Sequence, residues 1–125
     1  MKKAFFLLFA VLALPAAAEL RLTDDAGRTV VLAAPAQRIV SLAPHVTELL
    51  FAAGAGGKVV GATQYSDYPD AAKKIPRVGG YTSVDMEAVV ALKPDLVIAW
   101  KSGNRNQQYD RLEKLGIPVF VNEPR

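Results

Sequence analysis

The chain has 125 residues, which is enough for one domain of ordinary size. It contains no cysteine, which excludes a disulfide scaffold, a thiolate zinc site and a cysteine nucleophile. The formal net charge is +3, and Lys2 and Lys3 at the N-terminus supply two of these charges. The rest of the chain therefore offers no basic face to nucleic acid.

The first eighteen residues have the pattern of a secretory signal peptide. Lys2 and Lys3 form a short basic segment, residues 4–14 are apolar, and the small residues 16–18 follow a proline. The apolar run is too short for a transmembrane helix. We therefore expect residues 1–18 to direct export and to be removed before Glu19.

The next segment, residues 19–35, predicts a β-hairpin followed by a linker. Apolar and polar residues alternate over residues 20–32 around a glycine turn at residues 25–27. The narrow apolar side of this hairpin predicts that it packs on the edge of a larger body. Residues 33–35, Ala-Ala-Pro, form the linker.

Residues 36–125 predict an α/β lobe in which strands alternate with helices. Short apolar runs predict buried strands at residues 38–42 and 58–63. Between them, Pro44 suits the start of a helix and Gly54 suits its stop. The inward stripe of this helix is predicted to consist of Val46, Leu49, Leu50 and Ala53.

The second half of the lobe repeats the alternation. Residues 69–74 suit a short helical segment, and residues 84–92 predict a helix with Thr82 as its N-cap. A continuous apolar strand is predicted at residues 95–100, and a last strand at residues 117–121. The helix between these strands is predicted from a capping box of Asn104 and Gln107, an inward stripe of Tyr109, Leu112 and Leu115, and a stop at Gly116.

Four strands joined by helical segments predict a Rossmann-like lobe, with a four-stranded, mainly parallel sheet and flanking helices. The sequence ends a few residues after the last predicted strand, at Arg125. An α/β unit normally continues there with a helix that covers the sheet. We therefore expect the chain to be the first part of a longer protein.

Most of the tyrosine and tryptophan residues fall in loops next to predicted strands. Tyr65, Tyr68 and Trp100 follow two of the strands, and Tyr81 lies in the loop before a helix. Ligands of open parallel sheets bind at the carboxyl ends of the strands, and these side chains combine an apolar ring with a polar group. The pattern predicts ligand contact, above all for Tyr65 and Trp100. The alternative is that some of these rings only cover the end of the sheet.

The sequence shows no convincing catalytic or metal-binding set. His45 is the only histidine, and it either ligates a metal or haem iron or forms hydrogen bonds at the surface. Glu48, three residues after His45, is only weak support for a metal site. Ser41 lies near His45, but a third residue for a catalytic triad is lacking. The glycine-rich residues 54–57 follow a helix and precede a strand, which is the wrong order for a dinucleotide-binding loop. Neither an enzyme nor a bound metal is predicted.

Three segments resemble the periplasmic binding proteins that serve ABC importers of cobalamin, haem and ferric siderophores. The opening of the lobe, residues 39–54, is similar to that of the whole family. The run Tyr-Ser-Asp-Tyr-Pro at residues 65–69 resembles the cobalamin-binding members in particular. So does the strand that ends at Trp100 and continues with Lys-Ser-Gly-Asn. The resemblance covers about residues 38–121.

The resemblance implies a bilobal fold, in which the ligand lies between two α/β lobes joined by a long helix. This chain would supply only the N-terminal lobe. The resemblance also implies that Tyr65, Tyr81 and Trp100 line the ligand cleft, although the cobalamin-binding relative carries Trp at the position of Tyr81. Glu87 matches the docking glutamate of this lobe, which pairs with arginines of the membrane permease.

The expected protein is therefore a monomer of the periplasm that captures cobalamin as a transported ligand. It would need no catalytic residue, cofactor or resident metal, and it would contact the inner membrane only through the ABC transporter. A haem or ferric-siderophore binding protein of the same fold is the alternative. Haem would require an axial ligand such as His45 or a tyrosine.

Overall fold

The computed structural model describes residues 19–125, and the predicted signal peptide, residues 1–18, lies outside the described residues. Within residues 19–125 no helix is long and apolar enough to cross a lipid bilayer. The strands, α-helices and 3₁₀ helices (η) are, in chain order, β1 Leu20–Thr23, β2 Thr29–Leu32, β3 Ile39–Ser41, α2 Pro44–Ala52, η1 Gly56–Lys58, β4 Val59–Ala62, η2 Asp70–Lys74, β5 Gly79–Gly80, β6 Ser83–Val84, α3 Met86–Ala91, β7 Leu96–Trp100, α4 Asn106–Lys114 and β8 Val119–Asn122.

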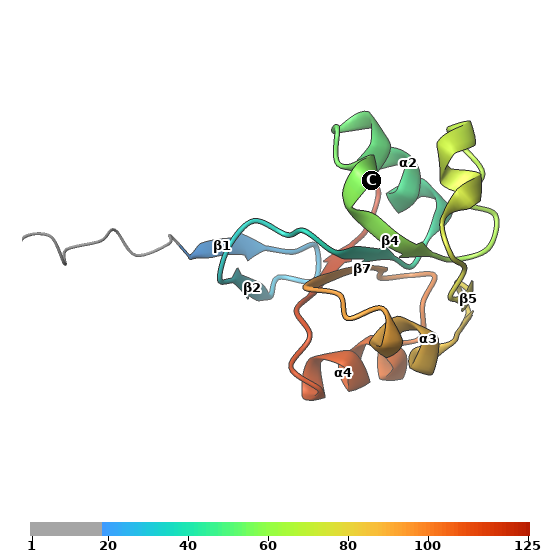
Figure 1. Ribbon diagram of the computed structural model, residues 1–125. Coiled ribbons are helices and arrows are strands. Elements are labelled where there is room, and N and C mark those ends of the chain that lie inside the picture. Colours follow the sequence, from blue (N-terminus) through green and yellow to red (C-terminus); the bar gives the residue numbers. More distant parts are fainter. Residues whose placement is uncertain (1–18) are drawn as a thin grey trace, which may run out of the picture.

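Four strands form a parallel sheet in the order β4-β3-β7-β8. Figure 1 shows α2 on one face of this sheet and α3 and α4 on the other, so the sheet is the middle one of three layers. The predicted Rossmann-like lobe and the antiparallel hairpin of β1 and β2 before it are confirmed. Because all four strands run the same way, their carboxyl ends meet at one edge of the sheet.

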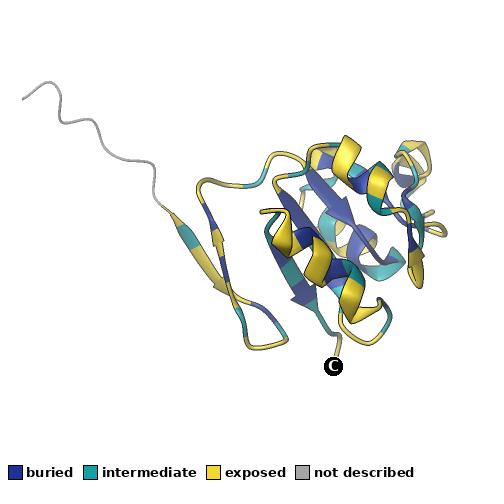
Figure 2. Ribbon diagram, turned by 90° about the horizontal axis from the view of Figure 1, so that it is seen from below, coloured by how far each residue is buried: buried dark blue, intermediate teal, exposed yellow. Residues whose placement is uncertain are grey.

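The larger part of the apolar core lies between the sheet and the helices α3 and α4. Val40, Val97 and Val119 of three neighbouring strands pack there with Val89 of α3 and Leu112 of α4. All five side chains are buried, and full burial of a side chain of this size contributes about 1.5–3 kcal/mol. Figure 2 shows the buried strands between helices whose outer faces are exposed.

The hairpin packs on the opposite face of the sheet. Val30 and Leu32 of β2 are buried against Ile39 and Leu96 of the sheet. The rest of the hairpin is largely exposed, and Figure 2 shows it standing to one side of the lobe. The predicted packing of the hairpin at the edge of a larger body agrees with this arrangement.

The inward face of α2 differs from the prediction. Val46 and Thr47 are buried, whereas Leu49 is 56% exposed and Ala53 is also exposed. The helix is rotated because the hydroxyl of Thr47 has an interior partner, the hydroxyl of Ser41 at 2.8 Å. A satisfied polar side chain therefore takes an inward position that the apolar pattern assigned to Leu49.

The start of α3 also differs from the prediction. Thr82 is not its N-cap, because the following residues Ser83–Val84 form β6 and pair with β5. The helix begins after Asp85, whose carboxylate accepts a hydrogen bond from the backbone N–H of Ala88 at 3.1 Å. An aspartate at this position satisfies one of the free N–H groups of the first turn.

In α4 the predicted capping box is wrong. The helix begins after Arg105, without a side-chain cap, and Asn104 is buried in contacts with other parts of the lobe. The inward stripe is confirmed at Tyr109 and Leu112, but Leu115 is 62% exposed because the helix has already ended there.

Candidate functional site

Three aromatic rings from separate segments meet at the carboxyl end of the sheet. Trp100 ends β7, His45 is the second residue of the helix after β3, and Tyr81 lies in the turn between β5 and β6. The ring centroids of Tyr81 and Trp100 are 5.2 Å apart at a tilt of 51°. Those of His45 and Trp100 are 5.1 Å apart, edge to face. We call these three residues the aromatic cluster.

Asn104 connects the backbones around this cluster. Its side chain belongs to a residue that is only 6% exposed. The amide oxygen accepts a hydrogen bond from the N–H of Trp100 at 2.6 Å, and the amide nitrogen donates to the carbonyl oxygens of Leu42 at 3.0 Å and Tyr81 at 2.6 Å. Sequence reasoning missed this role because two of the three partners, Leu42 and Tyr81, lie far away along the chain.

Gly103 lies directly against the ring of Trp100. A Cβ atom at this position would collide with the six-membered ring of the indole. The absence of a side chain therefore lets the loop after β7 fold closely onto the indole. The sequence shows Gly103 but not its contact with Trp100, because that contact depends on how the loop folds.

Tyr65 lies in the loop after β4 and is 75% exposed. Its backbone has φ +69°, a left-handed conformation that bulky residues rarely adopt and that occurs preferentially at functional sites. Tyr65 and Tyr81 line the same hollow of about 400 Å³. Its lining is completed by Gln64, Gly79, Gly80, Thr82 and Ser83.

A chain of buried hydroxyl groups anchors the loop that carries Tyr65. The hydroxyl groups of Ser66 and Thr47 are 2.9 Å apart, and Thr47 donates to Ser41 at 2.8 Å. Ser41 in turn donates to the carbonyl oxygen of Ala43 at 2.9 Å. Because the residue after Tyr65 is fixed in this way, the loop presents Tyr65 outward from a firm support.

His45 has a hydrogen-bonding partner in the lobe. Its Nε2 atom lies 2.7 Å from the side-chain oxygen of Asn122, at the carboxyl end of β8. The sequence left open whether His45 ligates a metal or forms hydrogen bonds, and the structure shows the hydrogen bond. Within residues 19–125 no three histidine, aspartate or glutamate side chains come together at a metal site.

Tyr68 contacts a different hollow from Tyr65. This hollow has a volume of about 420 Å³ and lies beside the aromatic cluster, because His45 lines it as well. Tyr68 is 69% exposed. The remaining lining residues are Glu48, Leu49, Ala52 and Pro124.

Glu87 lies on a separate surface, in the first turn of α3. It is exposed. It borders a hollow of about 390 Å³ between α3 and α4. The other residues of this hollow are Met86, Val90, Ala91, Arg111 and Leu115.

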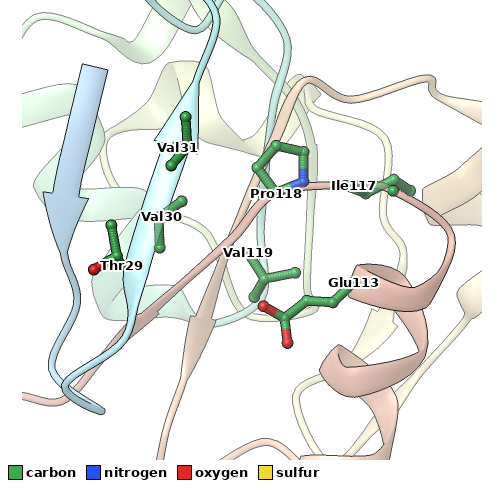
Figure 3. A pocket seen from close by; sticks show the side chains of 8 residues that line it. Thr29, Val30, Val31, Glu113, Ile117, Pro118 and Val119 are labelled. Carbon is green, nitrogen blue, oxygen red and sulfur yellow. The ribbon is translucent and has the colours of Figure 1, made fainter. Parts of the chain in front are cut away.

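A further hollow of about 230 Å³ lies between β2 and the start of β8 (Figure 3). Its one carboxylate, Glu113, is already paired with Arg28 at 2.6 Å. It is lined by Thr29, Val30, Val31, Glu113, Gly116, Ile117, Pro118 and Val119. No aromatic ring borders it, and it lies at the amino end of β8, away from the aromatic cluster. We assign it to the packing of the hairpin against the lobe.

Known proteins resemble this chain over most of the described lobe. Residues 39–125 match the family described as periplasmic binding protein. The vitamin B12-binding protein of Yersinia pestis (strain Pestoides F) is 47% identical over 89 residues, which cover 71% of this chain and 32% of that protein.

Solved structures show the same relationship. The periplasmic vitamin B12 binding protein BtuF of Vibrio cholerae is 45% identical, with a TM-score of 0.67 over 70% of this chain and 34% of that chain. The heme binding protein HmuT is 27% identical, with a TM-score of 0.75 over 90% of this chain and 37% of that chain. The chain thus spans about a third of the length of the relatives it matches. The match over residues 39–125 and these identities together establish that the chain belongs to the periplasmic binding protein family.

Proposed function

We propose that this chain forms the N-terminal lobe of a binding protein that captures cobalamin in the periplasm and delivers it to an ABC importer. The observation that carries the proposal is the gathering of Tyr81 and Trp100 at the carboxyl edge of the sheet, with Tyr65 across the adjoining hollow. Similarity to vitamin B12-binding proteins supports the choice of ligand.

The chemistry of this edge suits a corrinoid. A corrin is a broad macrocycle with an apolar face and many amide side chains. Aromatic rings provide contact area to such a face at low cost in conformational entropy. The amide of Gln64 and the hydroxyl groups of Thr82 and Ser83 border the same hollow as Tyr65, and they offer hydrogen-bonding partners to ligand amides.

Binding without catalysis is part of the proposal. Ser41 is the serine near His45 in the sequence, and it is fully buried. It donates to Ala43 and accepts from Thr47, so it belongs to the hydroxyl chain that supports the loop. Its hydroxyl is not presented to a substrate, and a transported ligand needs no nucleophile.

The ligand would be covered from two sides. Small-molecule sites usually bury 70–90% of the ligand surface, and the hollow beside Tyr65 is open on its outer side. We propose that a second lobe closes over the aromatic cluster in the complete protein. Residues 1–18 would direct export and be cleaved, and Glu87 would pair with arginines of the permease.

A haem-binding protein of the same fold is the second candidate. The fuller coverage of this chain by the heme binding protein HmuT favours it. The hydrogen bond of His45 Nε2 with Asn122 opposes it, because axial ligation through this nitrogen would require that bond to break. The lower identity of HmuT, 27%, also ranks haem behind cobalamin.

Calorimetric titration of the complete secreted protein, second lobe included, with cobalamin tests the proposal through Trp100. Loss of a buried aromatic anchor costs about 2–4 kcal/mol of binding free energy. The Trp100→Ala variant should therefore bind cobalamin at least tenfold more weakly than the wild type. Leu115→Ala, which removes an exposed apolar side chain from the end of α4, is the matched control and should bind normally. An unchanged dissociation constant in a folded Trp100→Ala variant would contradict the proposed site.

A further inference from the structure

We propose that Asn104 is a positioning residue of the ligand site, because its side-chain amide fixes how the rings of Tyr81 and Trp100 face each other. The inference deepens the proposed function and rests on it for its ligand measurement. Neither the ring of Tyr81 nor that of Trp100 is hydrogen-bonded to Asn104. The amide instead holds the two backbone segments from which these rings project.

The position of Asn104 follows from the way β3 and β7 separate. Their parallel pairing continues to the hydrogen bond from the N–H of Leu42 to the carbonyl oxygen of Ile98, 2.9 Å. In a regular parallel ladder the next bond would run from the N–H of Trp100 to the carbonyl oxygen of Leu42. The chain turns into α2 at this point, so these two groups no longer meet.

The amide of Asn104 takes the place of that missing bond. Its oxygen accepts from Trp100, and one N–H group donates to Leu42. The second N–H group donates to the carbonyl oxygen of Tyr81. An asparagine side chain has one amide oxygen and two N–H donors, so each of these groups has a partner here.

This arrangement makes the placement of Tyr81 depend on Asn104. The turn between β5 and β6 is short, and only two residue pairs connect its strands. At the base of the turn, the backbone N–H of Gln64 donates a hydrogen bond to the carbonyl oxygen of Gly79 at 2.8 Å. At the tip, the bond from Asn104 ties Tyr81 to the end of β7, which sets the 5.2 Å separation between the rings.

Burial makes the effect specific to the amide. The residue is 6% exposed and its bond to Leu42 is buried, so water has little access to replace the donor at Leu42. A buried carbonyl group that loses its donor keeps a penalty of desolvation. An aspartate has the same shape as asparagine but presents an oxygen to the carbonyl groups of Leu42 and Tyr81, which repels both. We therefore choose Asn104→Asp as the main variant.

Asn106→Asp is the matched control. Asn106 is exposed, and its side-chain oxygen accepts a hydrogen bond from the hydroxyl of Tyr109 at 2.7 Å. A carboxylate can accept this bond equally well, so the same chemical change should have no effect two residues away. Asn104→Ser is a second variant for the case that Asn104→Asp does not fold, because a serine leaves room for water at the carbonyl groups.

The first measurement needs no ligand. Trp100 is the only tryptophan in the sequence, and a Trp100→Phe variant supplies the background spectrum. We expect Asn104→Asp to shift the tryptophan emission and to reduce the near-UV circular dichroism of the Tyr81 and Trp100 pair. The far-UV spectrum should remain that of the folded protein, and Asn106→Asp should match the wild type in all three spectra.

The second measurement is a double-mutant cycle with cobalamin as the probe. Asn104→Asp should weaken binding at least tenfold in the wild type and less than threefold in the Trp100→Ala background, because both changes remove the same ring contact. If the wild type does not bind cobalamin, the proposed function fails, and the spectra still test the positioning role. Unchanged spectra in folded Asn104 variants, or equal losses of affinity in both backgrounds, would overturn the inference.

Discussion

At the scale of single residues, several parts of the lobe hold Trp100 in place. Its backbone is held by Asn104, its indole rests against Gly103, and its ring meets Tyr81 and His45. Such support fixes the ring before a ligand arrives, and preorganisation of this kind reduces the entropy that binding must overcome.

Gly103 offers a direct test of this support. Gly103→Ala places a methyl group where the indole lies, so the ring has to move away. We expect cobalamin affinity to fall at least tenfold, with a loss of about 1–3 kcal/mol in the free energy of unfolding from overpacking. Gly57→Ala is the control, because a Cβ there meets no atom within 4 Å. Cobalamin titration and thermal unfolding of both variants measure these two effects. Normal binding by Gly103→Ala would show that cobalamin binding does not depend on the position of the indole.

His45 should contribute far less to cobalamin binding than Trp100. Its ring touches the indole only edge to face, and an aromatic contact of this kind is worth about 1 kcal/mol. We expect His45→Ala to weaken cobalamin binding by less than tenfold in a fluorescence titration. If the protein instead binds haem and His45→Ala abolishes the Soret shift, His45 is an axial ligand and the second candidate is correct.

The aromatic residues of the site could be predicted from the sequence, whereas the hydrogen bonds that position them could not. Trp100 and Tyr81 were predicted from their places after or near strands, and the structure brings them into contact. Asn104 was misread as a helix cap, because its polar side chain before a helix has the local pattern of one. Trp100 is four residues away, but Leu42 and Tyr81 lie on segments that only the tertiary fold brings to Asn104, so no local pattern reveals these two partners.

At the scale of elements, the turn of the N-terminal hairpin closes the free edge of β8. The carboxylate of Asp24 accepts a hydrogen bond from the N–H of Val121 at 3.0 Å, and the N–H of Asp25 donates to the carbonyl oxygen of Val121 at 2.9 Å. Arg28 donates to the carbonyl oxygen of Val119 at 3.3 Å. An uncovered edge strand invites pairing with other chains, and the hairpin turn prevents this at β8.

Asp24 makes this contact dependent on pH. Burial acts to raise the pKa of its carboxyl, but hydrogen bonds from the backbone of Arg28 and Val121, from the Arg28 guanidinium and from the backbone of Ala26 outweigh burial and hold the pKa below the ordinary value of 3.8. The side chain of Asp24 is fully buried. Its contribution to stability is therefore complete above the ordinary pKa and is lost as the pH falls below 3.8 through the folded-state value.

Asp24→Asn should show how much the charged carboxylate of Asp24 contributes to stability. The variant replaces a charged acceptor of several hydrogen bonds, so we expect the free energy of unfolding at neutral pH to fall by about 1.5–3 kcal/mol. Its stability should also depend less on pH below 3.8 than that of the wild type. Urea unfolding at several pH values measures both effects. Asp70→Asn, whose side chain is 96% exposed, should behave as the wild type, and equal stability of Asp24→Asn would show that the hairpin turn does not support β8.

The order of the elements was largely predictable, and their exact faces were not. Alternating apolar runs, Pro44 and the stop glycines Gly54 and Gly116 located the strands and helices, and both glycines have positive φ angles. The rotation of α2 was missed because a buried threonine with hydrogen-bonding partners looks like a surface residue in the sequence. The hairpin was predicted, but its hydrogen bonds to β8 join residues that lie far apart in the sequence, such as Asp24 and Val121.

At the scale of the whole molecule, the lobe separates two surfaces. The aromatic cluster occupies the carboxyl edge of the sheet, and Glu87 lies on the outer side of α3. This separation would allow the ligand and the permease to be bound at the same time. A delivery protein needs this property, because it has to reach the transporter while it still holds its ligand.

Glu87→Gln tests the separation. The change removes the charge of an exposed side chain outside the aromatic cluster, so cobalamin affinity should stay within a factor of two of the wild type. Docking on the permease should weaken, and the rate of cobalamin uptake by cells should fall. Asp70→Asn, which removes a charge from a side chain that is 96% exposed, is the control for charge loss alone. Normal uptake with Glu87→Gln would remove this residue from the docking surface, and weakened ligand affinity would show that the two surfaces are coupled.

The identity of the ligand can be decided by a visible-light titration of the complete wild-type protein, second lobe included, with cobalamin and with haem. We expect the absorption spectrum of cobalamin to change saturably, with one molecule bound per protein. Haem in the same buffer should give no axial-ligand Soret shift and should not displace bound cobalamin. A saturable Soret shift with haem, together with an unchanged cobalamin spectrum, would show that the protein binds haem and not cobalamin.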